Sequence, residues 1–425
     1  MEPRVINILG MINLFRRIAL ILLVTTRLVA AGKALGAGNG VGQRVFLHLI
    51  CDGGIDPSMV FEWKGGTSNS YAVEAGSVER TSTSGLRHVS NPARPAIDAF
   101  FDLYGSRVAV LNGVVADDMG PRALDGSSME VSKAGVSRNW LSAYAEDAGK
   151  GRPTPVLVFP GVRIDGAMVD MSLFGSVPSS LMTNSPASTV FPVMIRDRIF
   201  RDLRVDHAAF AAGMRAGSAD ASMTKAQDKQ FRILQTLESS IPGTSGDWAA
   251  IYDAAQPAFV NQSKLAVRMF ASGKSLAAMV RVGTAGMWAP ASAHFASQSV
   301  SLQALFGGLS QILDYAYMTG QQSRLVVVVS GQYGRTPWLN SGAGKDPWPV
   351  SSMMFWGNGI RGRVTGGTDD VGRGLKIDPR FGTTTGDVIR ISLQNAYASM
   401  LFLAGSDWRK WTSAVPVSGL LEVGS

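Results

Sequence analysis

Continuous runs of β-prone apolar residues alternate with segments of helical periodicity along most of this 425-residue chain. Buried strands are predicted at 44–51 (RVFLHLIC), 107–115 (RVAVLNGVV), 156–161 (VLVFPG), 325–330 (LVVVVS) and 353–357 (MMFWG). Helices are predicted around 95–105, 137–148, 223–240, 261–280, 300–318 and 387–404. Between the first strand and the first helix, the Gly-, Ser- and Thr-rich residues 64–92 predict a surface loop. The alternation predicts an α/β fold in three layers, with a mostly parallel sheet between helices on both faces.

The N-terminus differs from the rest of the chain in charge. Residues 1–40 hold five basic residues and one acid, so they carry half of the formal net charge of +8. Arg16 and Arg17 precede the apolar run 18–24 (IALILLV), and small residues follow it. This order predicts an export signal over residues 1–37, and FRRIAL resembles a twin-arginine signal, with Met11 as an alternative start. The run is too short to span a bilayer as a helix, and a buried N-terminal helix is the alternative interpretation.

Composition excludes several classes of protein. Hydrophobic residues make up 46% and charged residues 17% of the chain, which excludes a disordered protein. A single cysteine, Cys51, excludes an intramolecular disulfide framework and a multi-cysteine zinc site. No run of basic residues is interleaved with aromatics, so nucleic-acid binding is not expected. Outside the export signal no apolar segment is long enough for a transmembrane helix, so none is expected in the mature chain.

Candidate chemistry lies in the loops that follow predicted strands, because ligands of such sheets bind beyond the carboxyl ends of the strands. These segments are 51–58 (CDGGIDPS), 117–128 (DDMGPRALDGSS), 286–295 (GMWAPASAHF) and 326–349 (VVVVSGQYGRTPWLNSGAGKDPWP). Ser127 and Ser128 have no visible partner base, and His48 alternates within a buried strand, where a hydrogen-bonded core histidine is expected. Four tryptophans lie near the loops, Trp288, Trp338, Trp348 and Trp356. Two of them are expected in the core, and for the other two both a core position and an exposed binding surface remain open.

The loop after the fourth strand carries a specific resemblance. SGQYGRTP at 330–337 and NSGAGKDPWP at 340–349 resemble the pattern SEFGRTP…N…AGRDHWP of the domain-of-unknown-function 1501 family, within the alkaline phosphatase and sulfatase superfamily. RVFLHLICDGGID at 44–56 and GNGIRGRVTGGTDD at 357–370 resemble further parts of that family in the same order. The resemblance implies one sulfatase-like α/β domain over residues 38–425, with a variable helical insertion around 165–270.

The superfamily cleaves phosphate and sulfate esters at metal sites built from Asp, His and Glu, so the resemblance can be tested position by position. Asp56 and Asp346 stand at acidic positions of the family pattern. At the replaced positions, Gln332 stands in place of a glutamate and Pro347 in place of a histidine. Ala289 and Ala291 stand in place of the aspartate and the histidine of the motif G-[FW]-D-T-H. The family motif Arg-x-His is replaced by Arg122, Ala123 and Leu124. An amide is a weaker metal donor than a carboxylate, and proline and alanine side chains have no donor atom. The pattern therefore implies an erased metal site, with no catalytic residue and no cofactor.

Two functions remain open. The first is an exported, catalytically inactive sulfatase-like protein that acts as a binding or structural component. It would be located in the bacterial periplasm or at the cell surface, with other exported or cell-envelope proteins as partners. The second is a metal-dependent phosphate- or sulfate-ester hydrolase with a rebuilt site, in which His294 substitutes for the missing histidine. Its candidate metal ligands are Asp52, Asp56, Asp346, His294 and Asp117 or Asp118. Arg335, in GRTP, is expected either to pair with a carboxylate near the old site or to hold an anion. A weaker third possibility is that the residual basic charge binds an anionic polymer.

Overall fold

The computed structural model describes the larger part of the chain, in several ranges. The described residues are 43–65, 71–116, 129–134, 136–152, 154–159, 169–170, 251, 253, 255–283, 285–290, 292–386 and 388–422. Several predictions lie outside them: the export signal, the helix at 223–240 and most of the insertion, together with Asp117, Asp118, Arg122, Ala123, Leu124, Ser127, Ser128 and Ala291.

An eight-stranded sheet crosses the middle of the described protein, in the order β14-β4-β13-β10-β1-β9-β7-β8. Its strands are β1 (Val45–Cys51), β4 (Val108–Val115), β7 (Val156–Val158), β8 (Val169–Asp170), β9 (Ala277–Val282), β10 (Leu325–Gly331), β13 (Val350–Gly357) and β14 (Arg363–Gly366). β1 pairs in parallel with β10 and β9, whereas β13 is antiparallel to β10 and to β4. All strands of this sheet except β13 therefore run in one direction.

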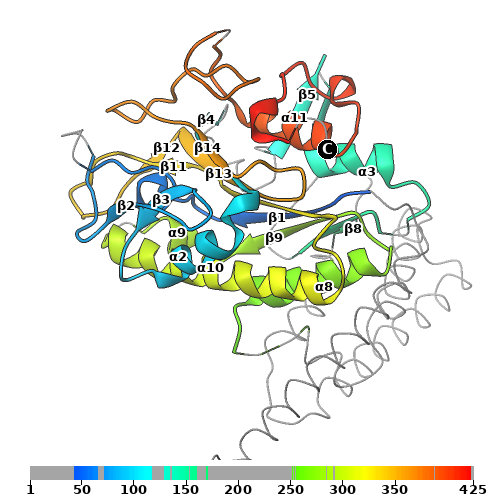
Figure 1. Cartoon of the computed structure of the whole chain (residues 1–425), viewed down its shortest axis with the longest axis horizontal. Coiled ribbons are helices and arrows are strands. Elements are labelled where there is room, and N and C mark those ends of the chain that lie inside the picture. The colour runs from blue at the N-terminus through cyan, green and yellow to red at the C-terminus, as the bar shows by residue number, and fades with distance from the viewer. Residues whose placement is uncertain are drawn as a thin grey trace, which may run out of the picture.

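Helices cover both faces of the sheet (Figure 1). One face carries α2 (Pro95–Tyr104), α8 (Ala258–Ala271) and α10 (His294–Met318), and the other carries α3 (Trp140–Ala148) and α11 (Leu393–Leu403). The prediction of an α/β fold, with a mostly parallel sheet between two helical layers, is confirmed. None of the helices in the described ranges combines the length and the apolar character that a membrane crossing requires.

The central strand β1 shows why the sequence pattern is informative. All seven residues of β1 are buried, because helices cover both faces of the sheet at this position. His48, within this strand, forms a hydrogen bond through Nε2 with Ser330 Oγ at 2.8 Å and accepts one at Nδ1 from Trp140 Nε1 at 3.3 Å. Burial lowers the pKa of His48 to about 3, so the ring is neutral at physiological pH. His48 is thus the hydrogen-bonded core residue that its position predicts.

The helix predicted at 261–280 ends at Ala271, and residues 277–280 belong instead to the strand β9, so the prediction is wrong there. Smaller elements complete the fold and include two further departures from the prediction. The expected loop over 64–92 contains a hairpin of β2 (Val78–Thr81) and β3 (Arg87–Ser90), which no apolar run marks because β2 lies at the surface. The helix expected from Ser137 begins at Trp140 and is capped by Asn139, whose side chain accepts from Leu141 N. The other short elements are β5 (Glu130–Lys133), β6 (Val136–Asn139), β11 (Gly334–Arg335), β12 (Pro347–Trp348), α9 (Ala285–Trp288), η1 (Pro57–Met59), η2 (Gly105–Arg107), η6 (Trp408–Lys410) and η7 (Ser418–Leu420).

Candidate functional site

The site begins where β1 and β10 end side by side, with Cys51 paired to Gly331. The chain leaves β1 through two glycines with positive φ, 101° at Gly53 and 95° at Gly54. A Cβ on Gly54 would lie 2.1 Å from the carbonyl oxygen of Tyr333. Glycine is therefore required both for the left-handed backbone and for the close approach of the two loops. This approach fixes the position of the loop that carries Asp56.

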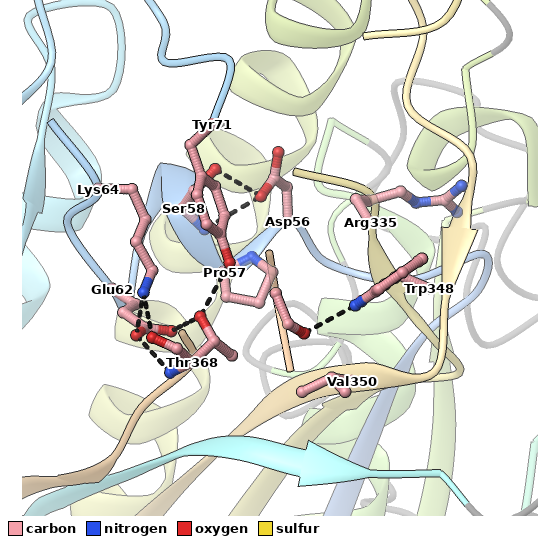
Figure 2. A pocket seen from close by; sticks show the side chains of 11 residues that line it. Asp56, Pro57, Ser58, Glu62, Lys64, Tyr71, Arg335, Trp348, Val350 and Thr368 are labelled. Atoms are coloured by element: carbon pink, nitrogen blue, oxygen red, sulfur yellow. Dashed lines mark hydrogen bonds and ion pairs between the residues drawn. The ribbon is translucent and has the colours of Figure 1, made fainter. Parts of the chain in front are cut away.

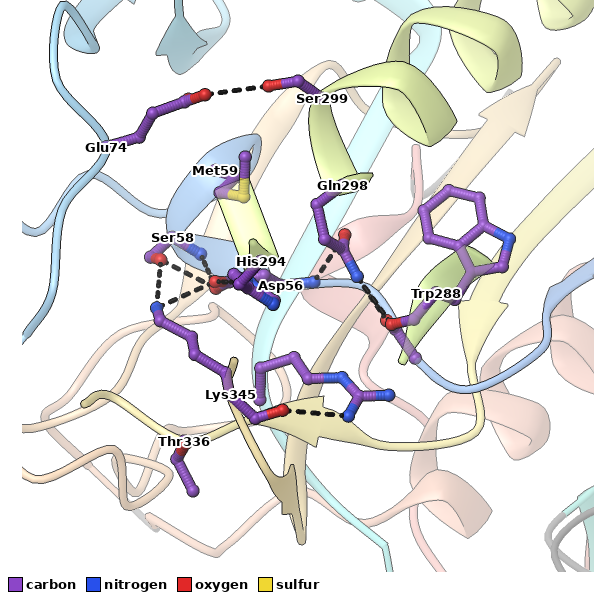
Figure 3. Close-up of polar contacts among 12 residues, drawn as sticks. Asp56, Ser58, Met59, Glu74, Trp288, His294, Gln298, Ser299, Thr336 and Lys345 are labelled. Atoms are coloured by element: carbon purple, nitrogen blue, oxygen red, sulfur yellow. Dashed lines mark hydrogen bonds and ion pairs between the residues drawn. The ribbon is translucent and has the colours of Figure 1, made fainter. Parts of the chain in front are cut away.

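Asp56 is the centre of a buried polar cluster (Figure 3). Its Oδ1 accepts hydrogen bonds from the backbone N of Ser58 at 3.0 Å and from Ser58 Oγ at 2.7 Å. Its Oδ2 accepts from His294 Nε2 at 2.8 Å and from Lys345 Nζ at 2.8 Å. These four bonds use the acceptor capacity of the carboxylate. Asp56, His294 and Lys345 are each no more than 2% exposed, so the cluster is shielded from water.

The segments that carry His294 and Lys345 are joined to each other. The backbone N of His294 donates to Ala343 O at 3.1 Å, and Ser292 forms an antiparallel bridge with Ala343. Ala293 and Ala343 have φ values of 49° and 57°, in the left-handed region. A residue with a Cβ adopts this conformation at a cost of about 1–2 kcal/mol. The backbone is thus strained beside the two side chains that close around Asp56.

The electrostatics of the cluster favour a charged carboxylate. Burial alone would raise the pKa of Asp56, but the charge of Lys345 and the hydrogen bond from His294 hold the pKa of Asp56 well below its usual range. Asp56 is therefore ionised at neutral pH and forms a buried ion pair with Lys345. The Lys345 ammonium binds Oδ2, one of the two carboxylate oxygens that Asp56 could offer to a metal ion.

The structure separates the other predicted metal ligands from Asp56. Asp52 is buried and pairs with Arg281. Asp346 is exposed, and its Oδ1 accepts from Asn340 Nδ2 at 2.9 Å. Of the predicted ligands in the described ranges, the structure brings only His294 into contact with Asp56.

Of the replaced positions, Gln332 has a structural role in the described part of the protein. Gln332, at the glutamate position, accepts a hydrogen bond at Oε1 from Gly53 N at 3.1 Å, so it fastens the loop after β1 to the end of β10. Pro347 is an exposed residue of β12, and Ala289 is half-buried after α9. None of these three side chains offers the anionic or imidazole donor that a divalent cation requires.

The residues present do not fit a divalent metal ion. Within the described ranges, no group of three or more His, Cys, Asp or Glu side chains comes together in a metal-binding arrangement. At Asp56 the donors are one carboxylate and one imidazole, and a cationic ammonium lies 2.8 Å from the carboxylate oxygen. A metal ion would have to displace Lys345 or bear its repulsion.

A small cavity borders the cluster (Figure 2). It measures about 20 Å³, and Asp56, Ser58 and Arg335 contribute to its wall. This space has room for at least one water molecule. Another part of the wall is tied together by hydrogen bonds, from Lys64 Nζ to Thr368 O at 2.7 Å and between Tyr71 Oη and Thr368 Oγ1 at 2.9 Å.

Two important residues are not singled out by the sequence. Lys345 precedes Asp346 in GKDPWP. The feature that could have identified it is a basic residue in a loop where the expected metal ligands are replaced. Gln298, on the first turns of α10, donates through Nε2 to Gly54 O at 3.0 Å and to Trp288 O at 2.7 Å. It thereby holds the glycine turn against α9, and nothing in its local sequence indicates this role.

The tryptophans divide as expected. Trp288 and Trp356 are buried, with 0% and 4% exposure. Trp338 is 45% exposed and packs edge-to-face on Trp348, with ring centroids 5.5 Å apart. Trp348 also lines the small cavity and donates through Nε1 to Gly372 O at 2.7 Å. An aromatic pair of the exposed Trp338 and the half-buried Trp348 therefore lies next to the candidate site.

Comparison with known proteins finds solved structures that are similar to this chain at low sequence identity. No family model and no curated protein match the sequence. The PsFucS1 sulfatase from Pseudoalteromonas sp. is 12% identical over 94% of this chain and 76% of its own, with a TM-score of 0.38. Ps i-CgsB in complex with k-i-k-neocarrahexaose is 9% identical over 88% and 75%, with a TM-score of 0.39. A 2-O GAG sulfatase is 10% identical over 90% and 76%, with a TM-score of 0.33. The α/β architecture described above rests on the strand order and register of this chain rather than on these superpositions.

Proposed function

We propose that this protein is an exported, catalytically inactive sulfatase-like protein that serves as a binding or structural component. The observation that supports the proposal most directly is the contact between Lys345 Nζ and Asp56 Oδ2, at 2.8 Å in a buried site. The ion pair uses the acidic position that the resemblance relates to metal binding. A fold does not determine an activity, so the same scaffold can take a role in interaction.

The cluster has a structural task in this proposal. Asp56 follows β1, His294 begins α10, and Lys345 lies in the loop before β12, so one carboxylate connects three segments that are distant in sequence. A buried charge that loses its partner costs about 3–5 kcal/mol. The cluster therefore stabilises the edge of the sheet where hydrolases of the superfamily would bind their substrates.

The pair of the exposed Trp338 and the half-buried Trp348 supports a role in binding. Tryptophan is enriched at protein interfaces, where it combines a large apolar area with one hydrogen-bond donor. Trp348 already uses its donor on Gly372 O, which holds the pair in one orientation. The proposed partners are other exported or cell-envelope proteins, in the periplasm or at the cell surface.

The proposal is tested by assaying the purified protein on aryl phosphate and aryl sulfate esters, with Mg²⁺, Ca²⁺, Mn²⁺ or Zn²⁺ added in turn. We expect no turnover above that of the Asp56→Asn variant in the same buffers, because the carboxylate is already occupied. Metal-dependent turnover by the wild-type protein that disappears in Asp56→Asn would overturn the proposal.

The second candidate function, a hydrolase with a rebuilt site, has one observation in its favour. Nε2 of His294 lies 2.8 Å from Oδ2 of Asp56, and its Nδ1 is buried with no hydrogen-bond partner in the described part of the chain. The same assay separates the two functions, since a rebuilt hydrolase must lose turnover in His294→Ala as well as in Asp56→Asn.

A further inference from the structure

Arg335 is buried with one edge of its guanidinium unused. The residue is 4% exposed, and its Nη1 donates to Lys345 O at 3.2 Å. Its Nε and Nη2 have no hydrogen-bond partner among the residues that the structure describes. In the planar guanidinium these two nitrogens present N–H groups along the same edge, the geometry that binds both oxygens of a carboxylate. Two aligned donors are thus left unsatisfied in a site where an unsatisfied donor is costly.

No acid within the described ranges binds to this edge of Arg335. Asp56 is committed to Lys345 and His294, and Figure 2 shows the Arg335 guanidinium pointing away from Asp56. Asp346 is exposed and accepts from Asn340. Asp52 pairs with Arg281.

Arg335 is the cation of this region whose guanidinium makes no ion pair with an acid of the described residues. Asp56 is paired with Lys345, and the charges of Asp56 and Asp346 act on Arg335 without contact to its free edge. Burial lowers the pKa of Arg335 to about 10, which still leaves the side chain charged at neutral pH. A buried cation without a counter-charge is strongly unfavourable. A monovalent carboxylate matches both the single charge and the two parallel donors, whereas a sulfate dianion would bring two charges against one.

We propose that Arg335 binds a carboxylate group side-on through Nε and Nη2. The carboxylate belongs either to a small free acid or to a side chain of a bound partner, and the chemistry at Arg335 is the same in both. This proposal goes beyond the proposed function, because it depends on the free edge of Arg335 and not on whether the Asp56 cluster is catalytic.

The probe is sodium formate, added to the full-length protein at pH 7 in exchange for sodium chloride, so that ionic strength stays constant. Formate should raise the thermal midpoint of the wild-type protein progressively with concentration, as a ligand of the folded state does. Arg335→Gln should abolish this rise. Arg335→Lys, which keeps the charge but not the fork, should weaken formate binding about 10–100-fold in calorimetric titration, the worth of one charge-assisted hydrogen bond. Arg361→Gln, at an exposed arginine, should respond like the wild type.

A second probe, N-acetyl-aspartate amide, distinguishes the two sources of the carboxylate. Binding of both probes assigns the site to a side chain of a partner, and binding of formate alone assigns it to a small free acid. A response to formate that equals the response to chloride, or that persists in Arg335→Lys and Arg335→Gln, would overturn the proposal. The Lys variant keeps the test decisive if Arg335→Gln does not fold. Neither outcome depends on ester turnover, so this test fails independently of the proposed function.

Discussion

At the scale of single residues, the partner of Asp56 decides what the site can do. A carboxylate that is shielded from solvent must be compensated, and Lys345 and His294 supply the donors at 2.8 Å each. A buried ion pair is weak evidence for net stability, since its desolvation opposes its attraction, but breaking it from one side exposes the full cost of the remaining charge. The Asp56–Lys345 pair should therefore behave as a coupled unit.

Lys345→Met tests this coupling, because methionine fills similar space without the charge and leaves Asp56 uncompensated. We expect a loss of about 3–5 kcal/mol in the free energy of unfolding, measured by urea denaturation. The double variant Asp56→Asn/Lys345→Met should lose less than the sum of the two single variants. Lys376→Met, at an exposed lysine, serves as the control and should change stability by less than about 0.5 kcal/mol. Strict additivity of the two single variants would contradict the ion pair.

His48 gives the residue-scale prediction for pH. Its pKa is about 3 in the folded protein, against about 6.5 in an unfolded chain, so only the unfolded state takes up a proton between these values. Stability should fall as the pH drops below 6.5, by about 2 kcal/mol at pH 5 from this residue alone. His48→Gln should lack that contribution. Urea denaturation of both proteins at pH 7 and pH 5 measures it, and an identical pH dependence would refute the assignment.

At the scale of elements, the glycine turn after β1 determines where Asp56 lies. Its backbone is left-handed and packs directly on the loop after β10, while Gln298 of α10 holds it from the other side. Polar side chains and backbone groups of three elements thus converge on one turn. The sequence shows this turn as a glycine pair after a buried strand. It does not show the contacts of the turn with Tyr333 and Gln298, because these residues are distant in the sequence.

Gly54→Ala, compared with Gly85→Ala, separates the contact from the backbone conformation. Both glycines have positive φ, 95° and 85°, so alanine is strained by about 1–2 kcal/mol at either position. A Cβ at Gly85 meets nothing within 4 Å, whereas at Gly54 it meets Tyr333 O at 2.1 Å. We expect Gly54→Ala to lower the thermal midpoint clearly more than Gly85→Ala. Equal losses in differential scanning calorimetry would show that the close approach of the two loops is unimportant.

At the scale of the whole molecule, the sequence predicts the sheet better than the site. Buried parallel strands such as β10 are continuous apolar runs, so they can be recognised without knowledge of their neighbours. The reversed direction of β13 and the surface hairpin of β2 and β3 cannot be recognised in this way, because pairing direction depends on the connections and exposed strands lack the apolar signal.

The site can be predicted only in part because its side chains come from segments that are distant in the sequence. Replacement of expected ligands at Gln332 and Pro347 can be read position by position from the resemblance. The cation that occupies Asp56 lies 289 residues away, and only the folded topology brings Lys345 to it. His294 was a candidate on sequence grounds because it lies close to the missing histidine, and its contact with Asp56 gives that position a physical role.

We propose that Lys345 takes the place of a metal ion at Asp56. The most direct test is the metal content of the purified full-length protein, measured by inductively coupled plasma mass spectrometry after incubation with divalent cations and dialysis. We expect a content far below one ion per chain, unchanged in Asp56→Asn. One tightly retained divalent ion per chain in the wild-type protein, lost in Asp56→Asn, would contradict it.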